Sequence, residues 1–150
     1  MRALTSIRSK TIHAILLVDD NRHGLLARRS LLEDEGYRIS TATNGEDALE
    51  AFAEEGFDLV ITDFKMSRMN GIELIRQIRR LRPNTPIILL SGFVEPLGLD
   101  ERSTDADVVI AKGANEVAHM LRAVSRISSG RLPRKPPTTQ RARARSRAGA

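Results

Sequence analysis

The sequence predicts an α/β protein in which five parallel strands form a doubly wound sheet with helices on both faces. Five short apolar runs alternate along the chain with segments of helical periodicity, at a spacing typical of right-handed crossovers. Several runs are almost continuously apolar, which indicates strands covered on both faces. Polar residues follow most of these runs, and the carboxyl ends of the strands are where such sheets carry their sites.

The five predicted strands differ in their patterning. The first reads Ile-His-Ala-Ile-Leu-Leu-Val, a run typical of a central strand. The second alternates apolar and polar residues, which favours an edge position. The predicted strands are residues 12–18, 37–42, 58–62, 86–90 and 108–111.

Apolar stripes at helical spacing predict four helices between and after these strands. They are residues 22–35, 45–55, 71–81 and 115–127. Their stripes are Leu25, Leu26, Leu31 and Leu32; Ala48, Leu49, Phe52 and Ala53; Ile72, Ile75 and Ile78; and Val117, Leu121 and Val124. Residues 93–107 show no sustained helical period, so any helix there is expected to be short.

Composition excludes several classes of protein. The length of 150 residues suits one domain, and the absence of cysteine excludes disulfides and thiolate metal sites. A basic N-terminus is followed by an apolar run too short for a signal peptide. Since no stretch approaches the roughly 18 apolar residues of a membrane span, we expect a cytoplasmic protein without membrane contact.

The positive net charge of +5 comes from the C-terminal end of the chain. Seven of the 24 basic residues lie in 130–150, which holds no acid, so residues 1–129 carry a net charge of −2. We therefore predict a flexible N-terminus (1–11), one folded domain (12–127) and a disordered basic tail (128–150). We do not expect nucleic-acid binding beyond nonspecific contact through this tail, and a merely solvated tail is favoured.

Acidic, hydroxyl and amino side chains follow four of the predicted strands. The first strand is followed by Asp19 and Asp20, the third by Asp63, the fourth by Ser91 and the fifth by Lys112. Three clustered carboxylates repel one another unless a cation joins them. Ligands that are all oxygen atoms favour a hard ion, and a carboxylate shell completed by water suits Mg²⁺.

This set of groups is suited to phosphoryl transfer. A carboxylate can attack phosphorus while a divalent cation and an ammonium neutralise the phosphoryl oxygens and a hydroxyl donates to one of them. The sequence lacks the G-x-x-x-x-G-K-[ST] loop that cradles nucleotide phosphates. The donor is therefore expected to be an already activated phosphoryl group rather than ATP.

Four segments resemble the motifs of response regulator receiver domains. They are Ile15–Asn21, Asp63–Gly71, Leu90–Gly92 and Lys112. The resemblance spans about residues 12–127 and implies a flavodoxin-like sheet with strand order 2-1-3-4-5. It also implies a phosphoprotein of a two-component phosphorelay, carrying 4-aspartylphosphate in its active state.

The resemblance implies a role for each site residue. Asp63 would accept the phosphoryl group from a sensor histidine kinase or a phosphotransfer protein. The Mg²⁺ ligands would be Asp20 directly, Asp19 through water, Asp63, and the backbone carbonyl of Lys65. Ser91 would follow the phosphoryl group and Lys112 would pair with it. The protein would not be an enzyme, apart from its own phosphorylation and slow dephosphorylation.

Three residues depart from the family pattern. Ser67 replaces a usual proline in the loop after Asp63, and Gly113 replaces a usual cis-linked proline after Lys112. Val109 stands where a switch aromatic is common. The chemistry of phosphorylation is thus expected to be intact, whereas the conformational readout is not expected to be standard.

Two other function classes fit the sequence less well. The chain could be a receiver-like interaction module that works without phosphorylation. A small phosphatase or hydrolase with Asp63 as nucleophile ranks last, because no second acid or base is evident near the loop. Only about twenty residues follow the last helix, so we expect output through contact with an unknown downstream protein rather than through a DNA-binding domain.

Overall fold

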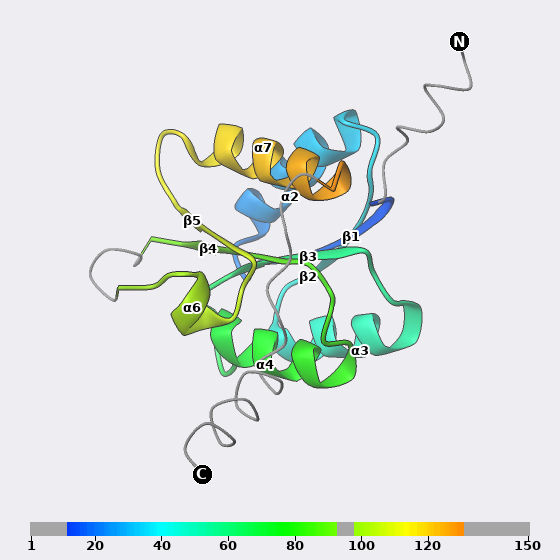
Figure 1. Ribbon diagram of the computed structural model, residues 1–150, viewed down its shortest axis with the longest axis vertical. Helices are drawn as coiled ribbons and strands as arrows, with labels where there is room; N and C mark the ends of the chain where they lie inside the picture. Colours follow the sequence, from blue (N-terminus) through cyan, green and yellow to red (C-terminus); the bar gives the residue numbers. More distant parts are fainter. Residues whose placement is uncertain (1–11, 93–97, 131–150) are drawn as a thin grey trace.

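The computed structural model describes residues 12–92 and 98–130. Its centre is a five-stranded, all-parallel sheet with the order β2-β1-β3-β4-β5 (Figure 1). The strands are β1 (Ala14–Val18), β2 (Arg38–Ala42), β3 (Leu59–Asp63), β4 (Ile87–Ser91) and β5 (Val108–Ala111). The predicted fold class, the strand order and the edge position of the second strand are confirmed.

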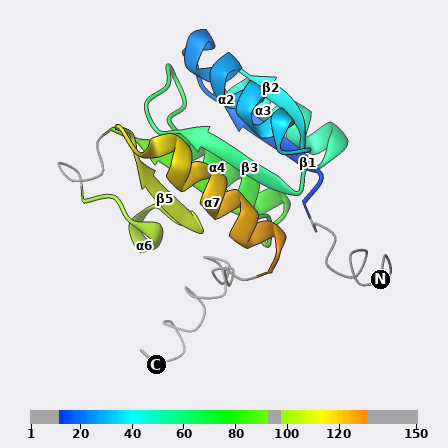
Figure 2. The same ribbon diagram turned by 90° about the horizontal axis from the view of Figure 1, so that it is seen from above.

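Five helices lie within the described ranges. They are α2 (Arg22–Asp34), α3 (Gly45–Glu55), α4 (Gly71–Leu81), α6 (Glu101–Thr104) and α7 (Glu116–Ser128). Helices α2 and α7 cover one face of the sheet, and α3, α4 and α6 lie on the other (Figure 1). Figure 2 looks onto the face that α2 and α7 cover. The structure therefore has three layers, as the alternation of strands and helices predicted.

Each face of the sheet has its own apolar cluster. One joins alternate residues of the central strands to Leu25 and Leu32 of α2 and to Met120 and Val124 of α7. The other cluster joins the remaining strand residues to α3 and α4, with Phe52 fully buried. All five residues of β1, β3 and β4 are buried, which explains why these strands read as continuous apolar runs.

The parallel register brings the carboxyl ends of the strands to one edge. From β1 the chain passes to β2 on one side, and β3, β4 and β5 follow on the other. The ends of β1 and β3 therefore flank a topological switch point. Val18 pairs with Thr62, Asp63 with Leu90, and Ser91 with Ala111, so these ends lie next to one another.

The predicted element boundaries agree with the structure to within two residues, and α3, α4 and β5 agree at both ends. The prediction of buried residues was less accurate at the margins of the apolar helix stripes. Val117 and Leu26 are 40% and 60% exposed. The first turn of α7 lies outside the apolar cluster, which begins at Met120. In residues 98–107 the structure shows one short helix, α6, as expected for this poorly patterned segment.

The ends of the predicted domain stay predictions. Helix α7 continues to Ser128, one residue beyond the predicted helix, and Ser128 is buried. The predicted flexible N-terminus (1–11) and residues 131–150 of the predicted basic tail lie outside the described residues. Among residues 12–92 and 98–130, no helix combines the length and apolarity that a membrane crossing requires.

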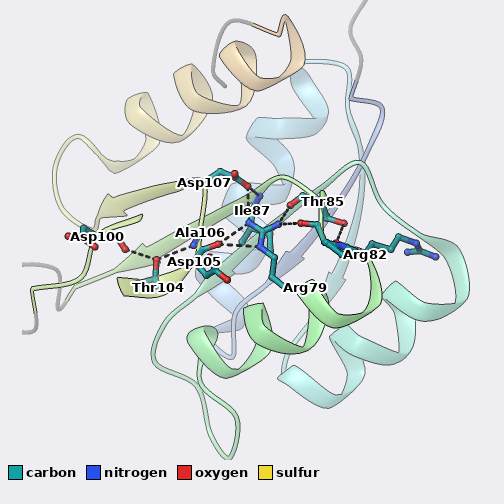
Figure 3. Close-up of polar contacts among 10 residues, drawn as sticks. Arg79, Arg82, Thr85, Ile87, Asp100, Thr104, Asp105, Ala106 and Asp107 are labelled. Atoms are coloured by element: carbon teal, nitrogen blue, oxygen red, sulfur yellow. Dashed lines mark hydrogen bonds and ion pairs between the residues drawn. The ribbon is translucent and has the colours of Figure 1, made fainter. Parts of the chain in front are cut away.

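A buried arginine ties the far end of α4 to the segment before β5 (Figure 3). Arg79 donates to the carbonyl oxygens of Pro83, Thr85 and Asp105 at 2.6–3.3 Å and forms an ion pair with Asp107 at 3.1 Å. The Asp107 carboxylate also accepts from the backbone N–H of Ile87 at 2.8 Å. This network lies at the amino end of the sheet, so it supports β4 and β5 from the end opposite Asp63.

Candidate functional site

Strand ends deliver four of the predicted site residues to one edge of the sheet. Asp63 is the last residue of β3 and Ser91 the last of β4, and both are buried. Asp19 follows β1 directly and is 1% exposed, and Lys112 follows β5. The backbone N–H of Lys112 donates to the carbonyl oxygen of Ser91 at 2.9 Å, which joins the last two strand ends.

The turn after β1 buries one of its two acids and leaves the other exposed. Asn21 caps α2, and its side chain accepts from the backbone N–H of Gly24 at 3.2 Å. The backbone N–H of Asn21 donates to Asp19 Oδ1 at 2.9 Å, which helps to hold that carboxylate inward. Asp20 is exposed at the rim of the site.

The loop after Asp63 is folded tightly onto the strand end. The backbone N–H of Gly71 donates to the carbonyl oxygen of Phe64 at 2.7 Å. A Cβ at Gly71 would collide with the carbonyl oxygen of Asp63, so only glycine fits there. Asn70 and Glu73 form a capping box that starts α4. Lys65 lies in this loop with an exposed side chain.

The three predicted acids form one cluster. Carboxylate oxygens of Asp19, Asp20 and Asp63 all lie within 4.8 Å of one another. Lys112 Nζ lies 2.5 Å from Asp63 Oδ1. Burial raises the pKa of the Asp63 carboxyl above its usual value; Lys112 opposes this rise without cancelling it, and the charge of Asp19 adds to it. The site therefore concentrates negative charge whose mutual repulsion a further cation would reduce.

A second cation, Arg28, was not predicted at this site. Its side chain extends from α2, and Nη1 lies 2.6 Å from Asp19 Oδ2. Nε and Nη2 lie 2.7 Å and 2.6 Å from Oε2 of Glu116, in the first turn of α7. The sequence holds one signal for this residue, since Arg28 falls at helical spacing on the stripe of Leu25 and Leu32. A charge on an apolar face requires a partner, and Asp19 is that partner.

The donor set fits a hard divalent cation. Three carboxylates from two neighbouring strand ends converge, and oxygen ligands of this kind suit Mg²⁺. A divalent cation bound there would lie near the positive charge of Arg28, which already pairs with Asp19. The structure places Asp19, Asp20, Asp63, Ser91 and Lys112 at one edge, as predicted. Their individual roles, and that of the Lys65 carbonyl, stay predictions.

The family model for the response regulator receiver domain matches residues 15–124, which is most of the described chain. The chain belongs to the response regulator receiver domain family. Domains of this family act in two-component signalling, bind Mg²⁺ at an acidic pocket, and interact with histidine kinases or phosphotransfer proteins. The acidic cluster of this receiver domain lies at the carboxyl edge of the sheet, next to the topological switch point where folds of this class carry their sites.

Relatives and solved structures agree with this assignment. The receiver domain is 38% identical over 79 residues to the transcriptional regulatory protein ZraR of Klebsiella oxytoca, covering 53% of this chain and 18% of ZraR. The chain thus matches less than a fifth of the length of that relative. A CheY-like receiver domain from Methanospirillum hungatei matches with a TM-score of 0.72 and 27% identity, covering 81% of this chain and 97% of the other.

A third match was solved with a metal ion in place. The response regulator TrrA of Thermotoga maritima, in complex with Mg²⁺ and BeF, matches with a TM-score of 0.66 and 34% identity. The match covers 75% of this chain and 99% of TrrA.

The structure also shows the surroundings of the residues that depart from the family pattern. Val109 is half-buried against the cluster on the α3 and α4 face, and its backbone N–H donates to Glu101 Oε2 at 3.1 Å. A Cβ at Gly113 would meet no atom within 4 Å, so sterics do not require glycine there. Ser67 is exposed. How these residues affect the conformational readout stays a prediction.

Proposed function

We propose that this receiver domain accepts a phosphoryl group on Asp63 from the phosphohistidine of a sensor histidine kinase or a phosphotransfer protein. The observation that carries the proposal is the setting of Asp63. It is a buried carboxylate at the topological switch point, 2.5 Å from Lys112 and clustered with two further acids. A buried carboxylate with a raised pKa in such a cluster is expensive to maintain and is typical of a functional group.

The transfer is a displacement at phosphorus. Lys112 contacts Oδ1 of Asp63, so we assign Oδ2 as the attacking oxygen. A new P–O bond forms to Oδ2 while the P–N bond to the donor histidine breaks. The imidazole leaves with the bonding electron pair and takes a proton from solvent. No nucleotide is needed, because the donor is already activated.

The other site residues stabilise the transferred group. The Lys112 ammonium, which contacts Asp63 in the free acid, would pair with a phosphoryl oxygen once Asp63 is esterified. Ser91, one position beyond the strand partner of Asp63, would donate a hydrogen bond to another phosphoryl oxygen. Asp20 would hold Mg²⁺ directly, Asp19 would hold it through water, and Asp63 and the Lys65 carbonyl would complete the protein ligands. Bound Mg²⁺ would supply neutralisation of the charge on the phosphoryl oxygens.

The wider role follows from the same chemistry. The domain would work in the cytoplasm, where its donors present their phosphohistidines, and would act through contact with a downstream protein. It would have no enzymatic activity on other substrates, and only slow hydrolysis would return Asp63 to the free acid. Nonspecific contact of the basic tail with nucleic acid is not needed for any of these steps.

Intact-mass measurement tests the proposal. The full 150-residue protein is incubated with acetyl phosphate and Mg²⁺. We expect the mass of one phosphoryl group to be gained by the wild type, to be lost when Mg²⁺ is chelated, and to be absent in Asp63→Asn. Asp34→Asn is the matched control, because Asp34 is an exposed aspartate at the end of α2. Equal gain in wild type and Asp63→Asn, or no gain in any variant, would contradict the proposal.

One observation favours the alternative of a phosphorylation-independent interaction module. Arg28 already neutralises Asp19, so the acidic cluster is partly satisfied without any metal ion. In a module of this kind Arg28 would serve as a permanent replacement for the cation. The mass experiment separates the two functions, since the module would gain no phosphoryl group.

A further inference from the structure

Arg28 bridges the acidic cluster and helix α7 through a buried ion-pair network. Its side chain is 9% exposed, that of Asp19 is 2% exposed, and that of Glu116 is 14% exposed. All three contacts are 2.6–2.7 Å long. Charged hydrogen bonds of this length in a buried setting are strong, and they hold the guanidinium in one place.

The helix is built to accommodate this guanidinium. Gly24 lies one turn before Arg28 in α2, where glycine costs helix stability relative to alanine. A Cβ at Gly24 would stand 3.2 Å from Arg28 Nη1 and 3.4 Å from Asp19 Oδ2. The missing side chain therefore leaves the room that the ion pair occupies. The close packing at Gly24 therefore also supports the ion pair between Arg28 and Asp19 as a built-in feature of the site.

The guanidinium keeps its charge in this position. Burial alone would lower the pKa of Arg28, but the hydrogen bonds to Glu116 and Asp19 outweigh burial and hold that pKa above its usual value. Arg28 is thus a fixed positive charge beside the carboxylates. It takes one oxygen of Asp19, and the backbone N–H of Asn21 takes the other.

We propose that Arg28 is a built-in counter-cation that competes with Mg²⁺ for Asp19, and that metal binding releases the guanidinium from Asp19 and leaves it held by Glu116 alone. The inference rests on the proposed function, because it concerns the same metal site. Two cations cannot both neutralise Asp19 at close range without repelling each other. Glu116 lies on the side of the guanidinium away from the metal ligands, so it is the partner that remains when Asp19 turns to the metal.

The proposal assigns Arg28 two effects. First, it lowers the affinity of the three-carboxylate site for Mg²⁺, so a higher metal concentration is needed to fill the site than would be needed without Arg28. It also links metal occupancy to the contact between α2 and α7, through residues 88 positions apart in sequence. Arg28 is therefore a positioning residue for the metal site rather than a residue that touches the phosphoryl group.

Titration calorimetry with Mg²⁺ alone, on the full chain without a phosphoryl donor, tests the competition. Removing one buried positive charge should strengthen binding, so we expect Arg28→Met to lower the Kd by about tenfold or more. Arg29→Met is the matched control, because Arg29 is the next residue of α2 and its ion pair with Glu33 is exposed. Its Kd should stay within about twofold of wild type.

The direction of the change separates competition from a merely structural role. If Arg28 only held Asp19 in a productive orientation, Arg28→Met would bind Mg²⁺ more weakly. An unchanged or raised Kd therefore overturns the proposal, as does a failure of both wild type and Arg28→Met to bind Mg²⁺. Binding by Arg28→Met in the absence of detectable wild-type binding supports it.

A second variant tests the role of Glu116 and keeps Arg28 in place. Glu116→Gln removes the charge that holds the released guanidinium, so it should weaken Mg²⁺ binding about tenfold. An unchanged or lowered Kd in this variant overturns the proposed role of Glu116, and that measurement does not depend on Arg28→Met folding. In the Arg28→Met background the same substitution should change the Kd by less than about twofold. Equal effects in both backgrounds also overturn that role.

Failure of this inference and failure of the proposed function give different results. The calorimetric titrations involve no phosphoryl donor, so they report on Arg28 whether or not Asp63 is phosphorylated. A protein that gains phosphoryl mass on Asp63 but binds Mg²⁺ equally well with and without Arg28 retains the function and loses the inference. The opposite pair of results retains the inference and loses the function.

Discussion

At the scale of single residues, the molecule places a carboxylate where its ionised form is disfavoured. Asp63 is 5% exposed and shares its site with Asp19 and Asp20. Lys112 offsets part of this cost through a 2.5 Å contact. Such an unfavourable charge is typical of functional sites. Here the binding of a cation, or the esterification of Asp63, would remove the cost.

The raised pKa of Asp63 leads to a prediction on stability. The folded state holds this proton more tightly than the unfolded state, so the contribution to stability is full below the ordinary pKa of 3.8 and is lost as pH rises through the raised folded-state pKa. At neutral pH without metal, ionised Asp63 therefore destabilises the fold. We expect Asp63→Asn to melt a few degrees above wild type at pH 7 in chelator.

The difference in melting temperature should shrink as pH falls through the raised pKa of Asp63, because wild type then also becomes neutral at this position. Thermal unfolding followed by circular dichroism across this pH range measures it. Asp34→Asn, at an exposed position, should show no such trend. A lower melting temperature for Asp63→Asn at pH 7 would show that the contact with Lys112 outweighs the cost of burial.

At the scale of elements, the sheet is supported at both ends by arginines that extend from helices. Arg28 of α2 lies at the carboxyl end, and Arg79 of α4 lies at the amino end. Arg79 donates hydrogen bonds to carbonyl groups of the loop segments before β4 and β5, in buried and part-buried surroundings (Figure 3). The short helix α6 and strand β5 are thereby tied to α4.

Replacing Arg79 should destabilise the domain strongly. In Arg79→Met the buried Asp107 carboxylate loses its ion pair and several carbonyl groups lose their donor, so we expect a loss of roughly 2–4 kcal/mol in the free energy of unfolding. Urea unfolding measures it. Arg80→Met is the matched control, since Arg80 is exposed on the same turn, and its cost should be within about 0.5 kcal/mol. Equal costs would show that the network contributes nothing specific.

At the scale of the whole molecule, the predicted site residues and the contacts described above for them lie within residues 12–92 and 98–130. We therefore predict that the chemistry does not require the basic tail. A protein truncated after Gly130 should retain the melting temperature of the full chain and its Mg²⁺-dependent gain of phosphoryl mass. Parallel intact-mass and unfolding measurements on both proteins check this. Slower phosphorylation of the truncated protein would assign the tail a role in the transfer.

Much of this architecture could be predicted from local sequence patterns. The apolar runs of β1, β3 and β4 are continuous because both faces of each strand are covered, and that requirement is visible residue by residue. Prediction was weaker at helix margins. Val117 and Leu26 continue the apolar stripes of α7 and α2 but lie beyond the area that the sheet covers. Helical periodicity shows which face is apolar, not how far the covering surface extends.

What the sequence by itself determined is the order of the elements and the residues at the strand ends, because strand length, turns and caps depend on neighbours along the chain. That order alone places five polar residues at one edge of the sheet, because the carboxyl ends of parallel strands lie together. They are Asp19, Asp20, Asp63, Ser91 and Lys112. Only the tertiary structure decided where the long arginine side chains go. Arg28 finds Glu116 88 residues away and Arg79 finds Asp107 28 residues away, because a buried guanidinium must pair with whatever carboxylate packing brings within reach.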